Sequence, residues 1–275
     1  MPDEEENLKA IANEIRRDIV TMIYKAGDGH PGPALSIVEI LVALYFSVLR
    51  VRPEEPRWAD RDRLILSKGH ACAALYATLA KKGYFSPALL PTFRALNSTL
   101  QGHPDMNKTP GIDATSGSLG NGLSIGLGMA LAGRMQRHDY NVFVITGDGE
   151  LQEGVVWEAA MCARKYRTSR LVCIVDHNHF QSGGAVDDIS GLTPILPKWE
   201  AFGWHCQEVD GHDFGQLLDA IAAAKAHEDG PSLIVARTVK GKGVPFMEAN
   251  NAWHKRVPTV DEWNQALTAL EVPAR

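Results

Sequence analysis

The sequence has few cysteines, no long hydrophobic run and no excess of positive charge. No apolar run approaches the roughly 18 residues that a membrane span requires, and the amino terminus opens with acidic residues rather than a signal peptide. The 28 lysines and arginines against 33 aspartates and glutamates give a net charge of −5. This balance argues against nucleic acid or an anionic membrane as a partner.

The cysteines show no close pair, and each lies inside an apolar pattern. They are Cys72, Cys162, Cys173 and Cys206. This pattern is typical of reduced core residues in a cytoplasmic protein.

No linker, repeat or low-complexity segment divides the chain. Its 275 residues, 45% of them hydrophobic, are enough to bury one large core. After a helical amino-terminal region, strand and helix patterns alternate, which is typical of a mainly parallel sheet with helices on both faces. We therefore predict a single α/β domain over residues 1–275, ending in a short carboxyl-terminal tail.

The individual elements follow from two periodicities. Short apolar runs rich in β-branched residues predict strands, and apolar residues three or four apart predict helices. The expected strands are 63–67, 141–146, 171–176, 205–209 and 232–238. The expected helices are 8–24, 36–49, 71–82, 125–131, 155–163, 214–227 and 260–270. Ser36 and Glu39 have the spacing of a capping box at the start of the second helix.

The most informative motif is Gly147-Asp148-Gly149, which directly follows the expected strand 141–146. Asn178 follows the next expected strand, so both motifs reach the same edge of a parallel sheet. Glycines let the backbone approach a phosphate, while carboxylate, amide and carbonyl oxygens suit a hard cation such as Mg²⁺, Ca²⁺ or Mn²⁺. The motif predicts a diphosphate–metal site in which the Asp148 carboxylate, the Asn178 amide oxygen and a backbone carbonyl near Phe180 would suffice as metal ligands.

Histidines occupy turns that glycine or proline punctuates. They are His30 in Gly29-His-Pro-Gly32, His70 in Ser67-Lys-Gly-His70, His103 in Gly102-His-Pro104, and His254 after Trp253. One such histidine is usually an ordinary solvated loop residue, but four beside a metal–diphosphate motif indicate a functional site. Because imidazole can be neutral or protonated near neutral pH, these side chains could bind a sugar hydroxyl or carbonyl and transfer a proton.

These motifs together closely resemble the amino-terminal half of transketolase, over about Leu8 to His254. The matching segments are the four histidine turns, Gly117-Ser-Leu-Gly-Asn-Gly122, Gly147-Asp-Gly149, Glu153-Gly154, Asn178, Gly203-Trp204 and Asp210-Gly-His-Asp213. The resemblance implies the thiamine diphosphate-binding fold, with thiamine diphosphate and Mg²⁺ as cofactors.

The resemblance also implies roles for individual residues. His30, His103 and His254 would face the hydroxyl groups of the donor sugar, and Glu153 would lie on an acidic path between paired active sites. These four are the catalytic candidates. The implied cofactor-binding residues are His70, Gly117, Ser118, Leu119, Asp148, Gly149, Glu150, Asn178 and His254. In relatives a glycine usually follows the position of His254, whereas Lys255 follows it here.

The length departs from that of a complete transketolase. A full transketolase continues into a second domain that holds the aminopyrimidine ring and supplies the glutamate that protonates it, whereas this sequence ends at Arg275. We therefore expect the amino-terminal subunit of a split transketolase, paired with a separate carboxyl-terminal subunit in a heterotetramer. The pair would transfer a two-carbon ketol unit from a ketose, or its phosphate, to an aldose.

Other interpretations share part of this pattern. A deoxyxylulose phosphate synthase or an oxoacid dehydrogenase α subunit would also contain Gly147-Asp-Gly149 and Asn178. A non-catalytic subunit that binds thiamine diphosphate is a further alternative. Lys240-Gly-Lys-Gly243 could contact phosphate, but a solvated lysine turn is the favoured interpretation.

Overall fold

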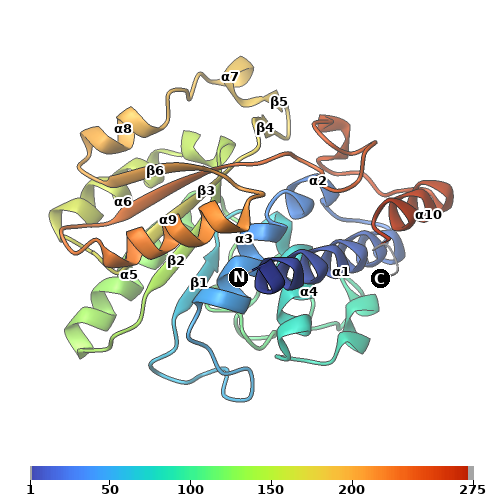
Figure 1. Ribbon diagram of the computed structural model, residues 1–275, viewed down its shortest axis with the longest axis horizontal. Coiled ribbons are helices and arrows are strands. Elements are labelled where there is room, and N and C mark those ends of the chain that lie inside the picture. The colour runs from blue at the N-terminus through green and yellow to red at the C-terminus, as the bar shows by residue number, and fades with distance from the viewer. Residues whose placement is uncertain (1, 272–275) are drawn as a thin grey trace.

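The computed structural model describes residues 2–271 and contains a parallel sheet between two layers of helices (Figure 1). Its strands are β1 (Arg63–Leu66), β2 (Val142–Gly147), β3 (Leu171–His177), β6 (His205–Asp210) and β7 (Ser232–Arg237). They lie in the order β1-β2-β3-β7-β6, and every neighbouring pair is parallel. The predicted α/β class and mainly parallel sheet are confirmed.

Helices cover both faces of this sheet. On one face lie α1 (Pro2–Ala26), α3 (Val38–Ala43), α4 (Cys72–Lys82) and α9 (Phe214–Ala226). On the other lie α5 (Asn121–Gln136), α6 (Gly154–Lys165) and α8 (Leu196–Ala201). Successive β2 residues alternate between the two cores: Phe143 packs into the first and Val144 into the second. Because both faces are buried, the strands read as continuous apolar runs.

The remaining elements lie beyond the carboxyl ends of the strands or at the end of the chain (Figure 1). They are α2 (Pro31–Leu35), the two-residue strands β4 (Phe180–Gln181) and β5 (Gly184–Ala185), α7 (Val186–Ile189) and α10 (Val260–Ala269). Helix α10 packs on α1, where the rings of Tyr24 and Trp263 stack 4.6 Å apart. Residues 272–275 of the predicted tail lie outside the described residues.

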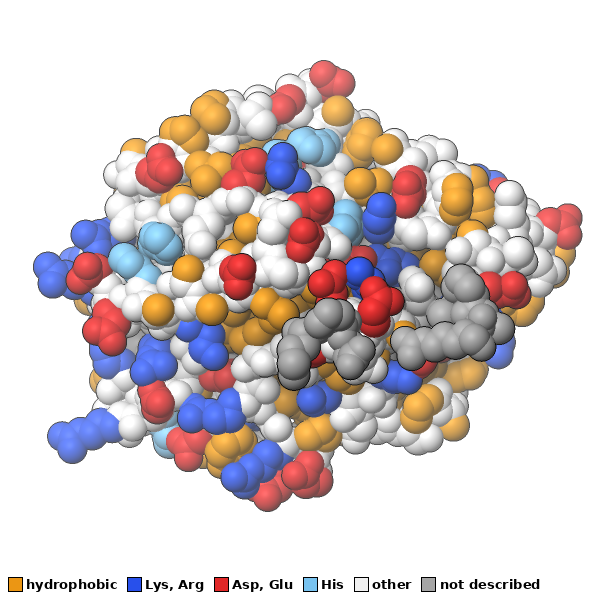
Figure 2. Space-filling model, viewed as in Figure 1, with side chains coloured by type: hydrophobic (Ala, Val, Ile, Leu, Met, Phe, Trp, Pro, Cys, Tyr) orange, Lys and Arg blue, Asp and Glu red, His pale blue; other side chains and the backbone are white. Residues whose placement is uncertain are grey.

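The surface charges and the apolar character of the helices are relevant to nucleic acid and membranes as partners. In Figure 2 acidic and basic side chains are interspersed over the face shown. Among the described residues, no helix combines the length and the apolar character needed to cross a membrane.

The capping-box prediction at Ser36 is wrong. Helix α3 begins at Val38, and its cap residue Ile37 makes no side-chain cap. Both side chains of the expected box are buried and have distant partners: Ser36 donates to Asp176 at 2.7 Å, and Glu39 pairs with Arg16 and His212. Burying a carboxylate without such partners costs more free energy than leaving a backbone amide at the helix start without a side-chain cap. The expected helix 36–49 therefore begins two residues late and ends in a π-helical turn, Leu44–Val48.

The cysteine prediction is correct only in part. Cys72 and Cys173 are buried free thiols, and Cys206 is partly buried. Cys162 is exposed on α6, so its expected core position is wrong. It lies on the outward side of an amphipathic helix whose apolar stripe is formed by other residues.

Two glycines of α5 provide a test of this packing. A Cβ on Gly126 would lie 2.5 Å from Val144 Cγ2 of β2, whereas one on Gly128 would meet no atom within 4 Å. We expect Gly126→Ala to lower the free energy of unfolding by about 1–3 kcal/mol through overpacking. The matched change Gly128→Ala should raise it by about 0.5–1 kcal/mol through helix propensity. Urea unfolding measures both, and equal effects would contradict this packing of α5.

Candidate active site

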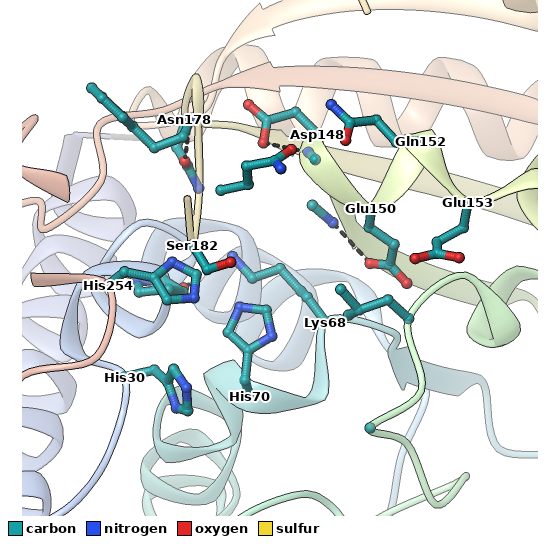
Figure 3. Close-up of a pocket in the computed structure, with 17 residues that line it drawn as sticks. His30, Lys68, His70, Asp148, Glu150, Gln152, Glu153, Asn178, Ser182 and His254 are labelled. Atoms are coloured by element: carbon teal, nitrogen blue, oxygen red, sulfur yellow. Dashed lines mark hydrogen bonds between the residues drawn. The ribbon is translucent and has the colours of Figure 1, made fainter. Parts of the chain in front are cut away.

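A cavity of about 330 Å³ opens at the carboxyl ends of the strands (Figure 3). Strand register explains its position, because Gly147 of β2 pairs with Asp176 of β3 and the next residues enter the loops together. Most of the sequence-predicted site residues line it: His30, His70, Gly117, Leu119, Asp148, Gly149, Glu150, Glu153, Asn178, Phe180 and His254. Residues distant in the sequence thus converge at one sheet edge, as parallel α/β topology predicts.

Asp148 is 1% exposed and is held by backbone amides. Its Oδ1 accepts from the Gly149 amide at 2.7 Å, and its Oδ2 accepts from the His179 amide at 2.6 Å. Burial, reinforced by the nearby charge of Asp176, raises the pKa of Asp148 to about 7. A cation at this position would stabilise the ionised carboxylate.

Asn178 is oriented by Asp176, a residue that the sequence analysis missed. The Asn178 amide nitrogen donates to Asp176 Oδ2 at 2.7 Å, and the Asn178 Oδ1 accepts from the Phe180 amide at 3.1 Å. This arrangement fixes which end of the amide is oxygen. The available signal was that Asp176 ends an expected strand two residues before Asn178.

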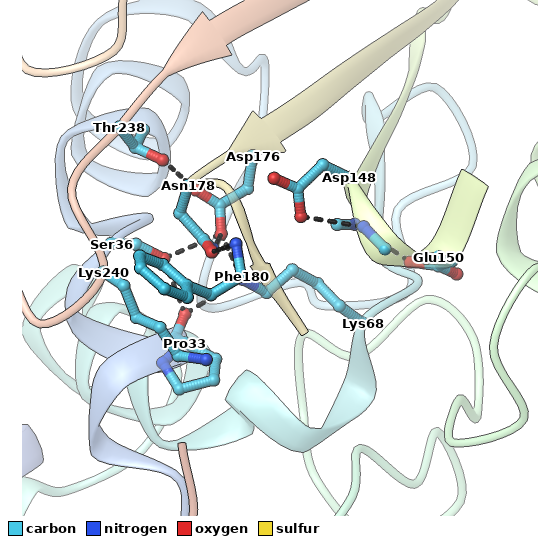
Figure 4. Close-up of polar contacts among 12 residues, drawn as sticks. Pro33, Ser36, Lys68, Asp148, Glu150, Asp176, Asn178, Phe180, Thr238 and Lys240 are labelled. Carbon is cyan, nitrogen blue, oxygen red and sulfur yellow. Dashed lines mark hydrogen bonds and ion pairs between the residues drawn. The ribbon is translucent and has the colours of Figure 1, made fainter. Parts of the chain in front are cut away.

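Asp176 itself is fully buried at the centre of a polar network (Figure 4). Besides Asn178, its donors are Ser36, Lys68 and Thr238. Burial alone would raise the pKa of this carboxyl group, but the Lys68 ammonium and the hydrogen bonds together hold it below its usual value. Asp176 is therefore a buried, ionised anchor beside the cavity.

Lys240 corrects another expectation. It is fully buried, not part of a solvated turn, and its Nζ contacts Asn251 Oδ1 at 2.6 Å and His254 Nδ1 at 2.9 Å. Burial and the charge of Lys68 lower the pKa of Lys240 to about 8. The loop after β7 folds back under α2, as the bond from the Gly241 amide to the Gly32 carbonyl shows. Two buried ammonium groups thus supply positive potential suited to a diphosphate.

Three histidines form the other side of the cavity (Figure 3). The ring centroids of His30, His70 and His254 lie 5.2–5.6 Å apart. Burial lowers the pKa of His30 to about 4 and, with the charge of Lys240, that of His254 to about 3. The pKa of His70 is also well below its usual value, chiefly through burial. All three rings are therefore neutral near pH 7 and can bind hydroxyl groups without a charge change.

The predicted acidic residues differ in their surroundings. Glu150 is buried, and its carboxylate accepts from Ser67 and from the amides of Gly120 and Gly147 at 2.7 and 3.0 Å. It therefore joins three loops around the cavity, and its contact with the cofactor stays a prediction. Glu153 is exposed at the rim, before α6, and its proposed role likewise stays a prediction.

Two predicted residues lie outside the cavity wall. His103 is exposed, and its ring lies beside Gly117, where a Cβ would be 3.4 Å from the ring Cδ2. Ser118 is exposed in the same loop. Gln181 and Ser182 line the cavity but were not predicted, because the β4–β5 hairpin is too short to give a strand pattern.

Comparison with known families identifies this arrangement. The family described as "Transketolase, thiamine diphosphate binding domain" matches residues 7–270. The chain belongs to the transketolase family. The predicted resemblance and the thiamine diphosphate-binding character of the domain are confirmed, and transketolase is favoured over the synthase and dehydrogenase alternatives.

The relatives include proteins of the same length and longer ones. A 6-deoxy-6-sulfo-D-fructose transketolase subunit, SqwG, of Clostridium sp. is 44% identical over 98% of both chains. A subunit of the apulose-4-phosphate transketolase of Phocaeicola vulgatus is 39% identical over 95% of this chain and 93% of its own. The transketolase structure from Leishmania mexicana superposes with a TM-score of 0.91 at 30% identity, covering 96% of this chain and 41% of that one. The chain thus spans about two fifths of that longer transketolase and is a transketolase subunit of the amino-terminal type.

The buried histidines predict an acid-sensitive fold. The folded-state pKa of His254, about 3, lies below the ordinary value of 6.5, so the unfolded chain binds more protons between these values. The free energy of unfolding should therefore fall as pH drops from about 6.5 towards 4. His254→Gln should reduce this loss by on the order of 2 kcal/mol, after allowance for partial exposure. Unfolding at a series of pH values measures it, with His227→Gln as control; an unchanged slope for His254→Gln would contradict the neutral buried ring.

Proposed function

We propose that this chain forms the diphosphate-binding half of a two-component transketolase, which moves a two-carbon ketol unit from a ketose to an aldose. The observation that carries the proposal is one cavity with Asp148 and Asn178 on one side and neutral histidines on the other. Its near-complete coverage of proteins named as transketolase subunits supports a division of the active site between two chains.

The residues present fit a divalent cation and a diphosphate. The Asp148 carboxylate, the Asn178 amide oxygen and the Phe180 carbonyl offer the hard oxygen ligands that Mg²⁺, Ca²⁺ or Mn²⁺ prefers. Lys68 and Lys240 bring two buried cations to the same region, which suits the diphosphate charge. Thiamine diphosphate, when bound, supplies the nucleophile and electron sink for carbon–carbon bond cleavage and formation.

The histidines would bind and orient the sugar. Lys240 donates to His254 Nδ1, and this places the ring proton on Nε2, which can donate to a sugar oxygen. His30 has a buried Nδ1 without a hydrogen-bond partner among the described residues, and its neutral ring lines the cavity, where it would face a substrate hydroxyl. His103, beside Gly117, would contact the sugar farther out.

The names of the relatives suggest the class of sugar. One acts on a sulfonated fructose and another on a sugar phosphate, so each name describes a small sugar with a terminal anionic group. We propose the same class here, a ketose donor that carries a sulfonate or phosphate, with a carboxyl-terminal subunit contributing the rest of its binding site.

An exposed apolar surface supports assembly with other subunits. Ile125 and Met135 of α5 are 36% and 84% exposed, and Met161 of α6 is 51% exposed. Helix α5 is apolar on its outward side as well as on its buried side, as expected for a helix that is covered in an assembly. Glu153 directly precedes α6, one of the two helices that carry this surface, which suits a path between paired sites in a heterotetramer.

The direct test is ketol transfer by the chain with and without its partner. We expect no turnover by the chain alone and turnover once the carboxyl-terminal subunit, thiamine diphosphate and Mg²⁺ are present. Removal of the cation with EDTA should abolish activity, and Mg²⁺ should restore it. Full activity of the isolated chain would refute the two-component proposal.

Substitution of the histidines separates a catalytic subunit from a passive cofactor-binding one. His30→Ala in the assembled enzyme should lower kcat/KM by about 10²–10⁴-fold, the range for loss of a positioned proton-transfer or binding group. Steady-state kinetics with His227→Ala as control measures this. An assembled His30→Ala enzyme with wild-type kinetics would favour the non-catalytic alternative.

A further inference from the structure

A second cavity of about 330 Å³ lies at the opposite end of the sheet from the active site. It is bounded by the loops that precede β2 and β3, at Tyr140 and Arg170, whereas Asp148 and Asn178 follow the other ends of the same strands. Strands of six and seven residues separate the two cavities by about 20 Å. In Figure 1 this end lies at the left, where α5 and α6 end. This cavity is therefore separate from the cofactor site.

Its wall is strongly basic. The basic side chains are Arg134, Arg137, His138, Arg167 and Arg170. Two of them have an acidic partner: Arg170 pairs with Asp139, and His138 Nδ1 lies 2.7 Å from Asp60 Oδ1. Within residues 2–271, the guanidinium groups of Arg134, Arg137 and Arg167 form no ion pair with a carboxylate, although Arg134 donates to the Tyr166 carbonyl at 2.6 Å.

This concentration of positive charge contrasts with the rest of the molecule. The whole chain carries a net charge of −5, yet the described part of this cavity has three guanidinium groups without a carboxylate partner. Basic side chains are also prominent at the left edge of the face in Figure 2, over the end of the sheet where α5 and α6 end in Figure 1. Such a local field attracts small anions.

Two of these arginines lie at the carboxyl ends of helices and have a left-handed backbone. Arg137 has φ +62° and Arg167 has φ +47°, both in the left-handed region that glycine or asparagine normally occupies. Each ends a turn after a helix, α5 for Arg137 and α6 for Arg167. This conformation closes each helix: the Arg137 and His138 amides donate to the Gly133 carbonyl of α5, and the Thr168 amide donates to the Ala163 carbonyl of α6. The two helix ends bring Arg137 and Arg167 to the same cavity.

We propose that this cavity binds the phosphate group of a small phosphorylated molecule, at a site distinct from the catalytic one. Arg137 and Arg167 would bind the dianion from the two loops, because guanidinium groups match phosphate oxygens in pairs. The His138 ring stacks on the buried Tyr140 ring with their centroids 5.9 Å apart, which holds His138 in place at the cavity wall. The volume is at the small end of ligand pockets and suits a sugar phosphate in size.

The test is a calorimetric titration of the full chain with inorganic phosphate as the minimal probe. The variant R137N/R167N removes both charges and places asparagine where the left-handed backbone favours it. We expect phosphate affinity to fall at least about tenfold, while the melting temperature stays equal or rises. Increasing NaCl should weaken binding to the wild-type chain.

Two reference variants distinguish binding in this cavity from a general effect of net charge and from binding in the catalytic cavity. K25Q/K225Q removes the same charge from the last turns of α1 and α9, outside the cavity. Lys240→Met removes a cation beside the active cavity. Both should retain the wild-type affinity of the second site. The proposal is overturned if the wild-type chain does not bind phosphate, if R137N/R167N binds it as the wild type does, or if K25Q/K225Q loses as much affinity.

Discussion

The active-site edge of the sheet depends on one buried carboxylate, that of Asp176 at the end of β3. It accepts hydrogen bonds from Ser36, Lys68, Asn178 and Thr238, which come from four different segments of the chain. A fully buried carboxylate costs several kcal/mol unless such partners surround it. The requirement to satisfy Asp176 therefore brings α2 and the loops after β1, β3 and β7 into one fixed arrangement, and this arrangement positions the Asn178 amide.

The charges around this anchor make the cavity complementary to its cofactor. Burial raises the pKa of Asp148 to about 7, while burial beside Lys68 lowers the pKa of Lys240 to about 8. A cation near Asp148 would favour the ionised carboxylate, and a diphosphate near the lysines would favour the charged form of Lys240. The histidines on the far side remain neutral, so the cavity has a charged part, which suits a cation and a diphosphate, and a neutral part, which we propose faces the sugar.

The sequence predicts the features that local rules govern. Buried parallel strands appear as apolar runs, and Asp148 and His30 are recognisable because glycine or proline lies beside them in short turns. The errors arise where distant partners override a local rule. Ser36 and Glu39 have a capping-box spacing but bind Asp176 and Arg16, whereas Thr259 and Glu262, with the same spacing, form a true capping box before α10. Lys240 appears as a solvated turn because only the fold reveals Asn251 and His254 beside it.

The most direct test of this account is the affinity for thiamine diphosphate and Mg²⁺ of the full chain carrying Asp176→Asn, measured by calorimetry with the carboxyl-terminal subunit present. The substitution keeps the shape of the side chain but removes the charge that balances Lys68 and orients Asn178. We expect cofactor affinity to fall at least about tenfold, as for loss of a supporting residue behind metal ligands, while exposed Asp188→Asn binds as the wild type does. Wild-type affinity in a folded Asp176→Asn chain would show that the site does not depend on this anchor.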